Sequence, residues 1–147
     1  MRWWAAIAVA LLALPAMLTG CGADSERQLL TEGARAAREA RSEVNTVRLI
    51  SNQFLDGNLW APAANRMVTD ADEALDQVVS GFEARQPGDA TARRRYDEFG
   101  EALDAAASAV RDTRIALANG DLTTVRQQVG VLEQAGRELD RLGESAR

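Results

Sequence analysis

The fold is decided by residues 87–121, PGDATARRRYDEFGEALDAAASAVRDTRIALANGD. A Pro-Gly pair breaks the chain at the start, and Asp89 follows as a typical N-cap, because its carboxylate accepts hydrogen bonds from free helix N–H groups. An Asn-Gly pair closes the stretch. Between these breaks, apolar residues recur at three- and four-residue steps, which predicts a helix over 89–119. The apolar positions are Ala92, Tyr96, Phe99, Leu103, Ala106, Val110 and Leu117.

Three further segments carry the same periodicity. Pro62 suits a first helical turn, and Asp121 is a second candidate N-cap. Ser25 with Gln28 forms a capping-box pattern, which predicts that the first helix starts there. The apolar positions are Leu30, Ala34, Ala37, Val44, Val47, Ile50 and Phe54, then Ala64, Met67, Ala71, Leu75, Val78 and Phe82, then Leu122, Val125, Val129, Leu132, Gly136 and Leu139. The predicted helices are 25–56, 61–86, 89–119 and 121–145.

We expect no strand, because no window alternates between apolar and polar residues with a period of two. Short connections between long helices favour antiparallel neighbours. Residues 25–147 are therefore expected to form an all-α, up-down-up-down antiparallel four-helix bundle. A three-helix arrangement with one broken helix is the alternative. The middle layers are mainly Ala, Val and Leu, which predicts a tightly packed core with little room for a bulky cofactor.

The first twenty residues have the layout of a secretory signal peptide. Arg2 supplies a positive charge, residues 3–14 (WWAAIAVALLAL) are apolar, and Pro15 precedes an end made of small residues. The segment leads into Leu18, Thr19, Gly20 and Cys21. An uncleaved transmembrane anchor is the alternative, but the apolar stretch is shorter than the ~20 residues that a span needs.

The tetrapeptide at 18–21 resembles the lipobox of bacterial lipoproteins, in which an aliphatic residue and two small residues precede a cysteine. The resemblance implies cleavage between Gly20 and Cys21 and a diacylglyceryl group on the Cys21 sulfur. Residues 21–24 would then be a lipidated cysteine and a short tether. Two acyl chains give stable anchoring where one is marginal. The implied location is extracytoplasmic, on the outer face of the cell membrane, or an outer membrane if the organism has one.

Composition excludes several classes of function. The formal net charge of −5 becomes −6 when Arg2, the only ionisable side chain of residues 1–20, is removed. An acidic domain repels phosphate groups, so we expect neither nucleic-acid binding nor electrostatic attachment to a membrane. The chain has no histidine, the commonest general base and transition-metal ligand. Every basic residue is Arg and alanine is abundant. This composition resembles that of small lipoproteins of high-GC, actinobacterial-type bacteria.

Two charged clusters were weighed as sites. The acidic run DADEALD at 70–76 fans around a helix, so we interpret it as a solvated acidic face rather than a cation site. The three arginines at 93–95 also diverge, and we expect solvated or interhelical salt-bridge roles for them. The sequence offers no His or Lys to activate a serine and no glycine-rich phosphate loop. We therefore expect no metal site, no cofactor and no enzymatic activity.

Leu59 and Trp60 are the candidate interaction residues, in a connection between two predicted helices. Tryptophan has an apolar body and a polar N–H group, and it is enriched at interface hot spots. We favour a placement in which Trp60 folds back on Phe54 and Leu122 and caps the core. The alternative is an exposed Trp60 that contacts a partner.

These observations favour a non-enzymatic interaction module of the cell envelope, held at the membrane by its lipid. Its first helix would start beside the lipid, which places the Pro87 turn near the membrane and the 57–61 loop away from it. That loop would meet a protein partner at the same membrane. The alternative is a protein that binds a small apolar or lipid ligand in a pocket near the membrane, lined by Phe82, Tyr96 and Phe99.

Overall fold

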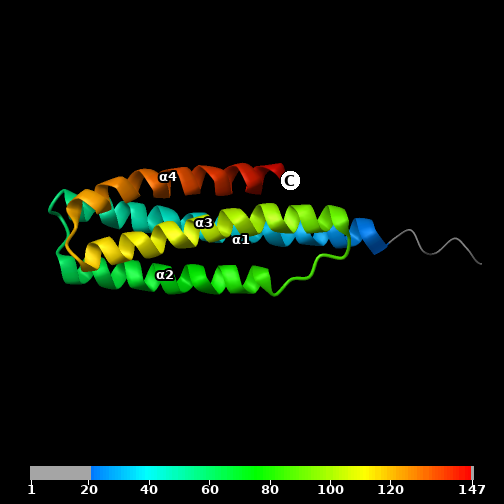
Figure 1. Cartoon of the computed structure of the whole chain (residues 1–147), viewed down its shortest axis with the longest axis horizontal. Helices are drawn as coiled ribbons and strands as arrows, with labels where there is room; N and C mark the ends of the chain where they lie inside the picture. Colours follow the sequence, from blue (N-terminus) through cyan, green and yellow to red (C-terminus); the bar gives the residue numbers. More distant parts are fainter. Residues whose placement is uncertain (1–20, 147) are drawn as a thin grey trace, which may run out of the picture.

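The computed structural model describes residues 21–146 as a bundle of four helices (Figure 1). They are α1 (Cys21–Leu55), α2 (Ala61–Glu83), α3 (Ala90–Ala118) and α4 (Leu122–Ser145). No strand occurs among these residues. The all-helical fold predicted from the apolar periodicity is therefore confirmed, while the predicted signal segment 1–20 lies outside the described residues.

Two predicted helix boundaries are wrong. The first helix begins at Cys21 instead of Ser25, so residues 21–24 are helical and not a tether. Asp24 lies in the first turn, where negative charge stabilises a helix, and pairs with Arg27 at 3.2 Å. The second helix ends at Glu83 instead of residue 86. A residue that precedes proline disfavours helical backbone, which accounts for the earlier end before Pro87.

The predicted caps of α3 and α4 are confirmed. The carboxylate of Asp89 accepts hydrogen bonds from the backbone N–H groups of Thr91 and Ala92, at 2.9 and 2.8 Å. Asp121 likewise accepts from the backbone N–H of Thr124 at 3.0 Å. These bonds satisfy donors that a helix start otherwise leaves free.

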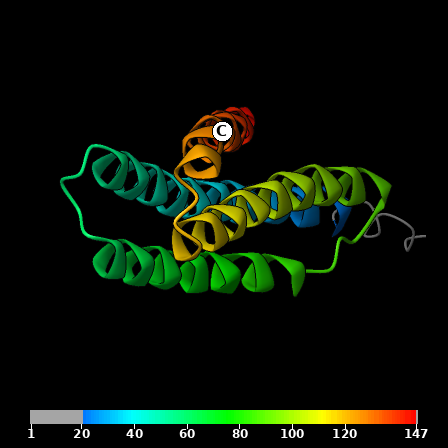
Figure 2. The same cartoon turned by 60° about the vertical axis from the view of Figure 1, so that its left-hand side comes forward.

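The helices are arranged around a central pair, α1 and α3 (Figures 1 and 2). Each member of this pair packs against the other and also against α2 and α4. In the described part of the chain α2 and α4 make no close backbone approach to one another. They lie on opposite sides of the central pair, below and above it in Figure 1.

The connections between helices gather at the two ends of the bundle. Residues 56–60 and 119–121 lie together at one end, and residues 84–89 lie toward the other, where α1 begins (Figure 1). At that second end, which we call the Cys21 end, Arg85 pairs with Glu32 at 3.3 Å. The connection from α2 to α3 is thus held against the first turns of α1.

The core is built largely from small and medium-sized aliphatic side chains. Its buried hydrophobic residues all lie between Leu29 and Leu142, so residues 22–147 contain the complete described core. The largest side chain that is fully enclosed is Phe99, whose ring packs directly on Gly33 of α1. A β-carbon at Gly33 would lie 2.6 Å from the Phe99 Cδ2 atom, so only glycine fits there without a shift.

Candidate functional site

Trp60 is the most exposed large hydrophobic residue that the structure describes, with 70% of its surface accessible. Its backbone is extended and forms the N-cap of α2, where its carbonyl accepts hydrogen bonds from Ala63 and Ala64 at 3.1 Å. The expectation that Trp60 folds back on Phe54 and Leu122 is wrong. Leu59 packs against the core instead, and successive side chains of an extended backbone point to opposite sides.

Trp60 belongs to an end of the bundle that carries few charges. We define the Trp60 end as residues 49–65 and 115–125, which contain two ionisable side chains, Asp56 and Asp121. Four of the six exposed large hydrophobic residues of the described chain lie within it. These four are Leu49, Trp60, Ile115 and Leu122, and the remaining two, Met67 and Val131, lie elsewhere on α2 and α4. The apolar residues left outside the core are therefore concentrated at one end.

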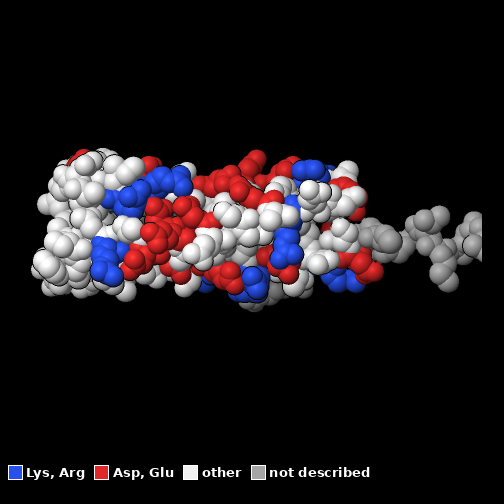
Figure 3. Space-filling view, turned by 90° about the horizontal axis from the view of Figure 1, so that it is seen from below, with Lys and Arg blue, Asp and Glu red and all other residues white. Residues whose placement is uncertain are grey.

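Arginines bound both segments of the Trp60 end. Arg48 and Arg66 flank the first segment, and Arg114 and Arg126 flank the second. Arg114 pairs with Asp72, whereas the other three make no ion pair within 4.0 Å with any residue that the structure describes. Figure 3 shows the result on one face: a left-hand end with little charge, then basic side chains, then an acidic region.

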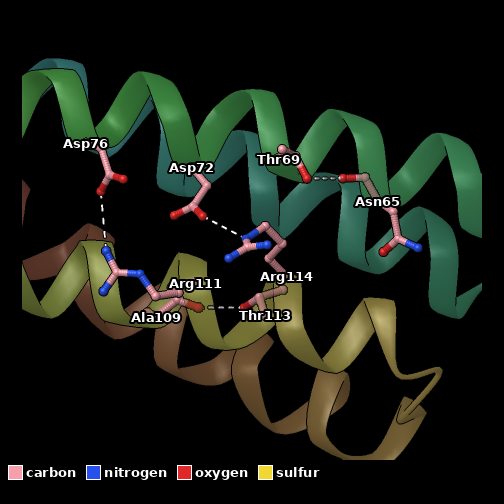
Figure 4. Close-up of polar contacts among 8 residues, drawn as sticks. All are labelled: Asn65, Thr69, Asp72, Asp76, Ala109, Arg111, Thr113 and Arg114. Atoms are coloured by element: carbon pink, nitrogen blue, oxygen red, sulfur yellow. Dashed lines mark hydrogen bonds and ion pairs between the residues drawn. The ribbon is translucent and has the colours of Figure 1, made fainter.

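The acidic run at 70–76 is only partly solvated, which corrects the sequence interpretation. Asp72 is buried, with 7% of its surface exposed, and its Oδ2 accepts a hydrogen bond from Arg114 Nε at 2.8 Å. Asp76 pairs with Arg111 at 3.3 Å one turn along (Figure 4). The run therefore holds α2 to α3. Among residues 21–146, no group of three or more His, Cys, Asp or Glu is placed to hold a metal ion.

The aromatic residues of the Cys21 end pack on one another. The Phe82 and Tyr96 rings stack with centroids 5.1 Å apart, and Phe82 meets Phe99 at 6.0 Å. The Tyr96 hydroxyl donates to the Glu83 carbonyl at 3.0 Å. Two open grooves of about 260 and 440 Å³ lie along α1 and the end of α2, and Phe82 of this cluster lines the first of them. Charged side chains of α1, such as Glu32, and Arg85 of the 84–89 connection line these grooves together with uncharged residues of α2, so the walls are of mixed character.

Contacts with nearby residues displace the pKa values of Asp121, Glu138 and Arg141. Hydrogen bonds from the Thr124 side chain and backbone lower the pKa of Asp121, which caps α4. A hydrogen bond from Arg141 lowers the pKa of Glu138 and raises that of Arg141. Helix capping and an ion pair one turn apart explain these shifts.

The residues of the expected lipidation site lie at the edge of the described chain. Leu18, Thr19 and Gly20 are outside the described residues, and Cys21 is the first residue of α1. Within residues 21–146, no helix is long and apolar enough to cross a membrane. No protein-family model, curated protein or solved structure matches this chain.

Proposed function

We propose that this protein is a non-enzymatic interaction module of the cell envelope, lipid-anchored at Cys21 and extracytoplasmic. Its helices run in up-down-up-down order, so the anchor and the Trp60 end are at opposite ends. Contacts across the bundle support this order. Asp72 and Asp76 pair with Arg114 and Arg111 in reversed order along the chain.

The observation that carries the proposal is the exposure of Trp60 in a charge-poor end of the bundle. Leaving an indole in water costs free energy, and here the core is closed by Leu59 without it. Tryptophan is among the residues that dominate binding energy when they become buried at an interface. The Trp60 end is therefore proposed as the contact surface.

The lipobox-like residues and the helix that begins at Cys21 support the anchored geometry. Helix α1 has 35 residues, which span about 50 Å at 1.5 Å per residue. With no unstructured tether after Cys21, the contact surface would be held at a set distance from the membrane. This arrangement suits a protein that presents one end to a fixed partner.

Replacing the acceptor cysteine tests the anchor. In the full chain, Cys21→Ser removes the thiol that would carry the diacylglyceryl group. We expect loss of metabolic labelling by a fatty acid, and loss of the mature size on a gel. Ser25→Ala is the matched control, because Ser25 lies in the same first turns of α1. Unchanged labelling of the Cys21→Ser protein would contradict the proposal.

A photo-cross-linking amino acid at position 60 of the full chain in living cells tests the contact surface. Position 86, exposed in the connection at the Cys21 end, is the control site. We expect adducts at position 60 that position 86 does not give. Identical adduct patterns at the two positions would show that the Trp60 end has no partner of its own.

A further inference from the structure

We infer that the Trp60 end binds an anionic lipid surface, with the Trp60 ring at head-group depth and the flanking arginines at the phosphates. The inference rests on the proposed function, since it names the partner of that same contact surface. A tryptophan at a membrane interface places its ring at head-group depth and keeps its N–H hydrated. The partner that fits this end is therefore a lipid surface with an apolar interior and anionic head groups.

The shape of the end favours a bilayer over a protein. Trp60, the most exposed large hydrophobic residue, belongs to the 56–60 connection at the end of the bundle (Figure 1). Insertion into lipid needs no complementary pocket, whereas a protein partner would have to supply one.

The arginines lie at the depth where lipid phosphates would be. Arg126 is four residues into α4 and Arg66 five residues beyond the start of α2, which places them about 6–8 Å from these helix ends. Arg48 lies seven residues before the end of α1, about 10 Å along it. Interfacial segments bury their apolar face about 5–10 Å deep. All three guanidinium groups would meet phosphates while the apolar end is inserted.

Acidic groups at the same end set the strength of binding. Asp56 and Asp121 are exposed there, and both oppose an anionic surface. Asp112 is exposed at a similar depth on α3, so the three flanking arginines without ion pairs face three carboxylates. The arginines therefore place positive charge behind an apolar tip, but they do not make the end cationic as a whole. The nearest acid on α2 beyond Arg66 is Asp70, one turn farther from the surface; this distance of about 6 Å is less than a Debye length, so salt screens Asp70 only partly. Binding is therefore modest and sensitive to single charges at this end.

Residues 22–147 on vesicles test the inference, because this segment holds the whole core and lacks Cys21. Trp60 is its only tryptophan, so its fluorescence reports on this end alone. With vesicles of equal parts phosphatidylglycerol and phosphatidylcholine, we expect a blue shift that salt weakens. Vesicles of phosphatidylcholine alone should give little or none. No shift with either composition would overturn the inference.

Variants with opposite expected signs sharpen the test. Removing each of Arg48, Arg66 and Arg126 by Arg→Gln weakens vesicle binding about fivefold, and Asp56→Asn strengthens it by a similar factor. Trp60→Ala, followed by sedimentation with vesicles, weakens binding about tenfold or more. The matched controls for the arginine variants are Arg→Gln changes at Arg38, Arg93 and Arg94, which are exposed away from the Trp60 end. Val131→Ala, at another exposed apolar residue, is the control for Trp60→Ala. Equal losses in controls and test variants would overturn the inference.

The vesicle result and the cellular result separate the two proposals. Protein adducts from position 60 in cells, with no vesicle binding, would support the contact surface and overturn the lipid partner. Vesicle binding with lipid adducts at position 60 supports both. Adducts that do not differ between positions 60 and 86, without vesicle binding, would overturn both.

Discussion

The two ends of the bundle use their aromatic residues in opposite ways. At the Cys21 end, Phe82 and Phe99 are buried and in contact, and Tyr96 covers them. At the Trp60 end, the largest aromatic residue of the described chain stands in water while Leu59 closes the core. All three aromatic side chains of the Cys21 end therefore contribute to packing, whereas at the Trp60 end Phe54 packs against the core and Trp60 does not. The same residue class has a structural role at one end and a proposed binding role at the other.

The largest effect should come from Phe99. Phe99→Ala leaves a cavity at the Cys21 end and should lower the free energy of unfolding by about 3–5 kcal/mol. Urea denaturation of residues 22–147, followed by circular dichroism, measures it. A loss below about 1 kcal/mol would contradict the structural role given to this end.

Gly33→Ala should also destabilise the Cys21 end, by about 1–3 kcal/mol, because the new methyl group meets the buried Phe99 ring. Alanine is otherwise the better helix former, by about 1 kcal/mol. Gly100→Ala is the matched control, since nothing lies within 4 Å of a β-carbon at that helical position. The two substitutions should therefore change the midpoint of urea denaturation in opposite directions. A stabilising Gly33→Ala would break the account of this contact.

Between the two ends, the buried Asp72 should couple to Arg114. A double-mutant cycle of Asp72→Ala and Arg114→Ala should give a coupling of about 1 kcal/mol, because one partner is buried and the hydrogen bond is charge-assisted. The exposed pair Asp76 and Arg111 should give less than half of that. Equal couplings in the two cycles would show that burial of Asp72 has no energetic consequence.

A weaker, pH-dependent effect is expected from Asp121 and Glu138. In the folded protein the pKa of Asp121 lies below its ordinary value of 3.8, and the pKa of Glu138 lies below its ordinary value of 4.5. The stability that each carboxylate contributes is therefore present above the unfolded pKa and is lost as the pH falls through the folded pKa. The urea concentration at the midpoint of denaturation should therefore decrease as the pH is lowered from neutral to values below these pKa values. In Asp121→Asn and Glu138→Gln, this fall should be shallower, and an unchanged slope would contradict the assignment.

The smallest effect on stability should come from Trp60. Trp60→Ala removes the most exposed large side chain and should change the free energy of unfolding by less than about 0.5 kcal/mol. Urea denaturation followed by circular dichroism measures it against Phe99→Ala. A loss comparable to that of Phe99→Ala would mean that both ends serve the core.

The four helices could be predicted from sequence because apolar periodicity and turn residues act locally. Asp89 and Asp121 marked helix starts correctly for that reason. The start at Cys21 could not be predicted, because the capping pattern at Ser25 competes with continuation of the helix. The close contact between Gly33 and Phe99 joins residues distant in the chain, so no local pattern signals it.

For the candidate contact surface, the sequence predicted where it lies in the chain but not how its side chains are placed. The sequence identified Leu59 and Trp60, but the favoured placement of Trp60 on the core was wrong, because both residues are large and apolar and no local pattern decides which of them packs. Burial of Asp72 was also missed, because which member of an acidic run meets an arginine depends on how α2 turns against α3. The sequence analysis did not single out the flanking arginines, because their common position becomes apparent only when the ends of the four helices come together.

The fluorescence of Trp60 tests the central claim most directly, because no other tryptophan exists in residues 22–147. An indole that lies outside the core should emit at the same wavelength in the folded and the urea-unfolded protein. A soluble quencher such as acrylamide should reach it equally well in both states. A folded protein with blue-shifted emission that is protected from acrylamide, and loses both properties on unfolding, would place Trp60 in the core and contradict the account.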